Sequence, residues 1–91
     1  MTPDTAQTIA LQSAGFIFQE DDIRDRFMAL SGVDVDDIRS RIADPAFLAS
    51  ILEFLVNFEP DLIACAETLG EKPETLVSAW RALGGGEGQE W

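Results

Sequence analysis

The sequence predicts an all-α fold: a compact bundle of about six short helices around one central apolar helix. Apolar residues recur at helical spacing in six segments of the chain. Proline or an acidic residue opens most of these segments and glycine closes two of them, as is typical of helix ends. The 91 residues are 46% hydrophobic, which suits one small globular domain. We place this domain at residues 1–83 and expect a flexible, glycine-rich acidic tail over residues 84–91.

The first three helices are expected over about residues 4–18, 20–31 and 35–43. Gly32 is expected to end the second helix, and Asp34 to cap the third. The second helix also holds acid-then-base pairs four residues apart, Glu20 with Arg24 and Asp22 with Arg26. On these two short helices the spacing predicts that six apolar side chains face inward: Ile23, Phe27, Leu30, Val35, Ile38 and Ile42.

The central helix is expected over about residues 45–58, with Asp44 as its N-cap and Pro45 at its first position. Its polar residues Ser50, Glu53 and Asn57 are three and four apart, so they form one narrow stripe. The rest of its circumference is apolar. A helix of this kind is one against which other helices pack.

The last two helices are expected over about residues 60–69 and 73–83, with Gly70 ending the first of them. Cys65 and Trp80 fall on their apolar stripes. We therefore expect both side chains to pack in the core.

A shift of 38 residues superimposes the two halves of the chain without a gap. Phe16 then falls on Phe54 and Gly32 on Gly70. This pattern indicates two similar three-helix halves, with the first and fourth helices at the centre. The alternative is that two amphipathic three-helix segments align without a repeat, and the sequence alone leaves both explanations open.

The net charge is −11, from 17 acidic and 6 basic residues. Such a charge repels phosphate backbones and anionic membrane surfaces. The chain lacks histidine, the most common general acid or base and metal ligand. A single cysteine excludes an internal disulfide and fits a reducing compartment. We find neither a signal-peptide pattern nor an apolar run of the ~18 residues that a membrane span needs, and we expect a cytoplasmic protein.

Several segments, taken in order, resemble the pattern of a family of short bacterial proteins, mainly alphaproteobacterial, catalogued as domain of unknown function 3572. The resemblance covers about residues 10–85, and the segments are Phe27–Gly32, Asp44–Leu48, Phe54–Leu55, Glu59–Pro60, Pro73–Glu74 and Leu83–Gly85. It implies a small soluble helical protein and carries over no activity, ligand or catalytic residue. Cys65 departs from the pattern, which leads us to expect a larger aromatic residue there.

Residues 62–83 resemble a DNA-binding helix-turn-helix, because Ala66 is followed four residues later by Gly70 and then by an apolar residue. Lys72 and Arg81 are the candidate nucleic-acid contacts. A recognition helix needs cations for phosphates, and two bases on a chain of charge −11 are few. We therefore favour an ordinary helical corner, with a nucleic-acid-associated regulator as the alternative function.

We assign no catalytic, cofactor-binding or metal-binding residue. A calcium loop that starts at Asp34 would need glycine at its sixth position and glutamate at its twelfth, where the chain has Arg39 and Pro45. The acidic residues 20–22 fit the start of a helix better than a catalytic pair. Because no nucleophile lies near a base in the sequence, we do not expect an enzyme.

The leading hypothesis is a non-enzymatic protein-interaction module that uses no cofactor. Glu53 and Asn57 are its candidate contact residues; they form either the solvated edge of the central helix or a polar contact with a partner. Trp91 is a third candidate, as an interface anchor or as part of a free chain end. The partner is an unidentified protein or a second copy of the chain.

Overall fold

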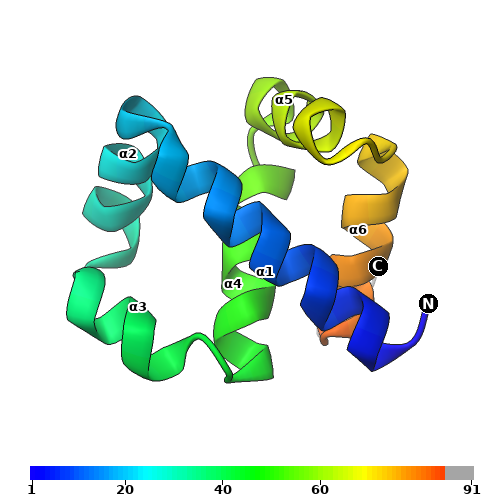
Figure 1. Cartoon of the computed structure of the whole chain (residues 1–91), viewed down its shortest axis with the longest axis horizontal. Helices are drawn as coiled ribbons and strands as arrows, with labels where there is room; N and C mark the ends of the chain where they lie inside the picture. Colours follow the sequence, from blue (N-terminus) through cyan, green and yellow to red (C-terminus); the bar gives the residue numbers. More distant parts are fainter. Residues whose placement is uncertain (86–91) are drawn as a thin grey trace, which may run out of the picture.

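A computed structural model describes residues 1–85 of the chain and shows six α-helices over this range (Figure 1). Their bounds are Pro3–Gln19 (α1), Asp21–Ser31 (α2), Val35–Arg41 (α3), Pro45–Val56 (α4), Glu59–Leu69 (α5) and Pro73–Ala82 (α6). The all-α prediction is confirmed for the described residues.

The predicted helix ends are formed by local hydrogen bonds. The Asp44 carboxylate accepts a hydrogen bond from the backbone N–H of Ala46 at 2.9 Å, so it caps α4. Asp34 and Asp37 form a reciprocal capping box at the start of α3. α2 and α5 end at Gly32 and Gly70, whose φ angles of 72° and 71° lie in the left-handed region that favours glycine.

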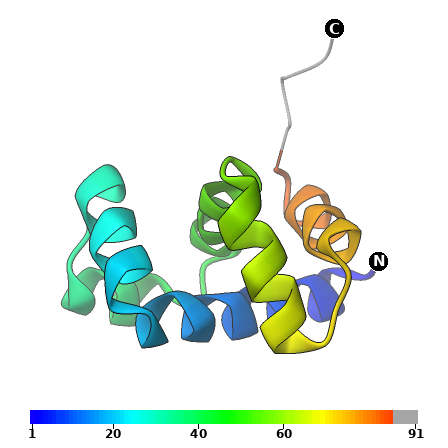
Figure 2. The same cartoon turned by 90° about the horizontal axis from the view of Figure 1, so that it is seen from above.

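The centre of the bundle consists of α1 and α4. α6 packs against both of them, and α5 also contacts both, so these four helices enclose most of the core (Figures 1 and 2). α4 supplies five large buried side chains to this core: Phe47, Leu48, Ile51, Leu52 and Leu55. The apolar α4 therefore lies inside the molecule as predicted, and α1 shares this central position.

The two halves agree in some of their helix bounds and differ in packing. At a shift of 38 residues α1 would cover residues 41–57, whereas α4 covers Pro45–Val56. α2 and α5 start and end 38 positions apart, and so do the first residues of α3 and α6. However, the α5–α6 pair packs on both central helices, whereas α2 packs closely on α1 alone and α3 on neither. The 38-residue correspondence thus holds for local structure but not for tertiary packing.

The inward-facing prediction for α2 and α3 is wrong at two of its six residues. Phe27 and Ile38 are buried, but Leu30 is 74% exposed and Val35 is 49% exposed. The reason is that helical spacing gives the apolar face of a helix without showing whether a neighbour covers that face. Here α2 and α3 stand away from α4 (Figure 1).

The predicted ion pairs on α2 are also replaced by others. Arg24 lies 3.4 Å from Asp21 and 3.5 Å from Asp25 instead of pairing with Glu20. Arg26 does not pair with Asp22, because its guanidinium reaches Asp61 on α5. A long arginine side chain can thus prefer a tertiary partner to one on its own helix.

The chain beyond α6 turns back over Trp80. Gly84 has a φ of 94°, and the backbone N–H of Gly85 donates to the carbonyl oxygen of Trp80 at 2.8 Å. A Cβ atom at position 85 would overlap the Trp80 indole. Trp91 lies outside the described residues. Within residues 1–85, no helix has the length and apolar character that crossing a membrane requires.

Candidate functional site

A groove of about 560 Å³ lies between α2 and α4, where the two helices stand apart (Figure 2). We call it the α2–α4 groove. Its lining comes from two helix faces and the residues that follow them: Arg26, Phe27, Leu30, Ser31, Ser50, Glu53, Phe54, Asn57 and Phe58. The volume falls in the range of ligand-binding clefts, about 300–1,000 Å³.

The α4 wall of the groove contains the whole predicted polar stripe. Ser50, Glu53 and Asn57 all line it, since residues three and four apart share one face of a helix. Both candidate contact residues of α4, Glu53 and Asn57, are therefore in one place. The structure puts their stripe opposite α2, and this wall is where a bound molecule would meet α4.

The floor of the groove is aromatic. The rings of Phe27 and Phe54 meet edge to face with centroids 5.2 Å apart, and Phe18 meets Phe27 in the same way at 6.3 Å. These contacts between α1, α2 and α4 follow the geometry that aromatic pairs prefer. The floor is consequently apolar and consists of rings in mutual contact.

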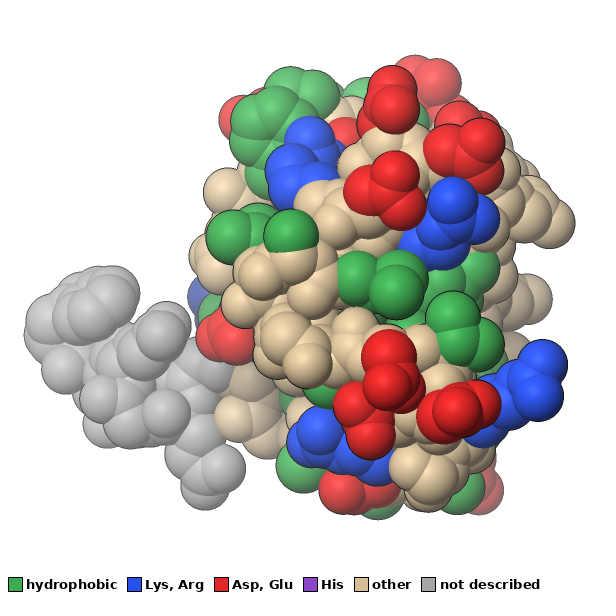
Figure 3. Space-filling view, turned by 90° about the vertical axis from the view of Figure 1, so that its left-hand side faces the viewer, with side chains coloured by type: hydrophobic (Ala, Val, Ile, Leu, Met, Phe, Trp, Pro, Cys, Tyr) green, Lys and Arg blue, Asp and Glu red, His purple; other side chains and the backbone are tan. Residues whose placement is uncertain are grey.

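The rim of the groove exposes large apolar side chains. Leu30 is 74% exposed and Phe58 is 46% exposed. Both side chains could become buried if another molecule packed against the groove. Figure 3 faces α2 and α3 and shows hydrophobic side chains between acidic and basic ones on this part of the surface. An apolar floor with an apolar rim is typical of an interaction surface.

One end of the groove is closed by a cation. The Arg26 guanidinium lies over the Phe58 ring at 4.9 Å and over the Phe54 ring at 5.5 Å, and it pairs with Asp61 in the first turn of α5. Asp61 is buried, so the pair fixes Arg26 in place. The positive charge of this arginine is thus already satisfied within the protein.

The remaining polar groups of the groove differ in whether they have a partner within the protein. The hydroxyls of Ser31 and Ser50 donate to the backbone carbonyls of Phe27 and Phe47 at 2.7 and 2.6 Å. In the described part of the chain, the Glu53 carboxylate forms no ion pair. Glu53 is half-buried at the groove wall, where its carboxylate is accessible to a bound partner.

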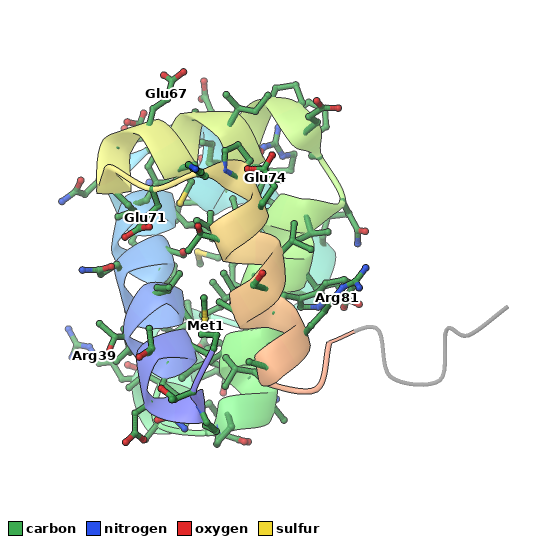
Figure 4. All side chains as sticks on the ribbon, turned by 90° about the vertical axis from the view of Figure 1, so that its right-hand side faces the viewer. Met1, Arg39, Glu67, Glu71, Glu74 and Arg81 are labelled. Atoms are coloured by element: carbon green, nitrogen blue, oxygen red, sulfur yellow. The ribbon has the colours of Figure 1, made fainter. Side chains whose placement is uncertain are left out.

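The helix-turn-helix-like corner has an acidic surface. Lys72 precedes α6 and Arg81 lies in its last turn, and both are exposed. Figure 4 shows Glu67, Glu71 and Glu74 around the junction of α5 and α6, with Arg81 further along α6. The two candidate nucleic-acid contacts therefore do not gather into one positive patch, and this geometry disfavours phosphate binding.

Cys65 lies in the core between α5 and its neighbours. Burial raises the pKa of its thiol, and this effect outweighs the hydrogen bond with Ser13, which lowers the pKa. A thiol of this kind is a poor nucleophile at neutral pH. No group of acidic or cysteine side chains in residues 1–85 has the arrangement to hold a metal ion.

Sequence reasoning missed the α2 side of the groove and Phe58. Leu30 was assigned to the core, because an apolar stripe on a short helix has the same pattern whether or not it is covered. The polar stripe of Ser50, Glu53 and Asn57 is visible in the sequence, but nothing in the sequence shows which helix faces it.

Comparison with known proteins places the chain in a family. Residues 3–86 match the family described as "Protein of unknown function (DUF3572)", which covers nearly the whole chain. No curated protein and no solved structure matches.

Proposed function

We propose that this chain, which belongs to the DUF3572 family, is a non-enzymatic protein-interaction module that binds a partner protein through the α2–α4 groove. The observation that carries this proposal is the groove itself, with an aromatic floor and a rim where Leu30 is 74% exposed. Exposure of apolar surface to water is unfavourable, so a partner that covers this surface gains binding free energy.

The composition supports a binding role over a catalytic one. The chain has no histidine, and its one thiol is buried with a raised pKa. The ionisable groups near the groove are Arg26, which Asp61 neutralises, and Glu53. A lone carboxylate can orient a bound partner but has no second group with which to share proton transfer.

The test is a comparison of Leu30→Asp with Leu11→Asp in affinity capture from a bacterial lysate. Leu30 lies on the groove rim, whereas Leu11 is 46% exposed on α1 and does not line the groove, so the same charge is introduced at an accessible leucine in both variants. We expect proteins captured by the wild type to be lost with Leu30→Asp and retained with Leu11→Asp.

Other occupants give other outcomes. If both variants captured the same proteins, the groove would not be the binding site. Capture that disappears after nuclease treatment would instead favour the nucleic-acid-associated alternative. A wild-type dimer in sedimentation equilibrium that Leu30→Asp converts to a monomer would identify the partner as a second copy of the chain.

A further inference from the structure

We propose that the occupant of the α2–α4 groove is a basic amphipathic helix of a partner protein, with a lysine or arginine that pairs with Glu53. This inference rests on the proposed function, because it names the chemistry of the partner that binds the same groove. Three features of the groove carry it: its length, the character of its two walls and its charge.

The length of the groove matches two turns of a helix. The α4 wall extends from Ser50 to Asn57, seven residue steps of about 1.5 Å each, which gives about 10 Å. A helical ligand that inserts apolar residues at positions i, i+3 or i+4, and i+7 spans the same distance, as in helix-in-groove complexes. The groove therefore offers room for three consecutive anchors of one helix.

The walls also suit a helix. In the other half of the molecule α6 packs against α1 and α4 at once, so α4 already accepts a helix on one of its sides. On the groove side α3 takes no such position, and the aromatic floor stays open to anchors between Leu30 and Phe58. An extended strand would need unpaired backbone groups along the groove, and the walls are helices whose backbone groups are paired internally.

The charge of the groove selects a basic ligand. Arg26 is occupied by Asp61 and by two phenyl rings, which leaves Glu53 as the carboxylate of the lining that forms no ion pair within residues 1–85. The chain as a whole has a charge of −11, which attracts cationic segments over the Debye length and repels acidic ones. A lysine or arginine of the ligand, next to its apolar anchor residues, would pair with Glu53 on the α4 wall.

The test is selection from a display library of helical peptides of about 14 residues. The peptides have fixed apolar residues at i, i+4 and i+7, and the other positions vary between acidic, basic and neutral residues. Full-length protein serves as bait, and Leu30→Asp serves as counter-selection. We expect the recovered peptides to be rich in lysine and arginine. In fluorescence anisotropy at low salt, Glu53→Gln should weaken a recovered peptide about fivefold.

The matched control is Glu67→Gln, which removes an equal charge from the exposed side of α5 away from the groove. We expect it to change the affinity by less than about 1.5-fold, and we expect high salt to abolish the effect of Glu53→Gln. Acidic or neutral peptides among the recovered sequences, failure to recover any groove-dependent peptide, or equal effects of the two glutamine variants would overturn the inference. Groove-dependent capture from lysate together with any of these results would leave the interaction module in place with a different partner.

Discussion

The helices of the α2–α3 corner and of the α5–α6 corner start at equivalent positions at a shift of 38 residues, yet the two corners bury very different numbers of apolar side chains. The first corner encloses two apolar side chains, Phe27 and Ile38. The second encloses six: Leu62, Cys65, Ala66, Leu76, Ala79 and Trp80. One local architecture thus gives an open structure in one half and a sealed structure in the other.

The two corners carry different residues at some equivalent positions. Arg24 corresponds to Leu62, and Arg41 corresponds to Ala79. Leucine and alanine can be enclosed without cost, whereas an arginine must keep its charge solvated or paired. Arg24 pairs with exposed acids of α2, and the Arg41 guanidinium lies 4.9 Å above the Phe47 ring at the surface.

The α2–α4 groove lies at the corner that carries these two arginines, although neither of them lines it. The sealed corner supplies packing that stabilises the domain, while the open corner supplies accessible apolar surface. Under the proposed function, stability and recognition fall to different halves of this small protein, and mutations in the two halves should separate these properties.

The largest expected effect contrasts the same substitution in the two corners. Leu76→Ala removes a fully enclosed side chain and should lower the free energy of unfolding by about 3 kcal/mol. Leu30→Ala removes a side chain that is 74% exposed and should change it by less than about 0.5 kcal/mol. Urea unfolding followed by far-ultraviolet circular dichroism measures both values. Similar losses at the two sites would contradict the division into a sealed and an open half.

An intermediate effect is expected at the ion pair that joins the two corners. Arg26→Met leaves the buried Asp61 carboxylate without its partner and should lower the free energy of unfolding by about 1.5 kcal/mol. This value is below that of a fully buried pair because the Arg26 side chain is 41% exposed.

The control for this pair is Arg24→Met, since the acids beside Arg24 have side chains that are 81% and 72% exposed. We expect its effect to stay within about 0.5 kcal/mol. A double-mutant cycle of Arg26→Met with Asp61→Asn should give a coupling of about 1 kcal/mol. A coupling near zero would mean that the pair does not connect the corners energetically.

The sequence predicts the local part of this comparison well. Asp34, Asp44, Gly32 and Gly70 fix their helix ends through neighbours a few residues away, so their roles can be read without tertiary information. The apolar α4 indicates its central position in the same way, because an amphipathic helix needs only one buried face.

The groove could be predicted only in part, because it depends on what two distant helices do to each other. The polar stripe with Glu53 and Asn57 is visible in the sequence, but its facing wall is not. The reach of Arg26 to Asp61 spans 35 positions and replaces the local pairing with Asp22 that helical spacing favours. Contacts of this kind are decided by packing, which spacing along one helix does not encode.

The smallest effect concerns the sealed corner and is confined to alkaline pH. Burial raises the pKa of the Cys65 thiol above its ordinary value of 9.0. Above about pH 9 the unfolded chain therefore releases a proton that the native protein retains, and the free energy of unfolding should fall as the pH rises. The stabilising contribution is complete below this pH and is lost as the pH passes through the raised pKa.

The composition makes this small effect measurable. The chain has no tyrosine, and a Lys72→Arg background removes its one lysine, so few side chains other than the Cys65 thiol can change the stability at alkaline pH. In that background, Cys65→Ala should flatten the alkaline decline, because the ionisable thiol is gone. An unchanged decline would mean that the thiol is equally accessible in the native and unfolded states, and the α5–α6 corner would then be less tightly sealed than its packing indicates.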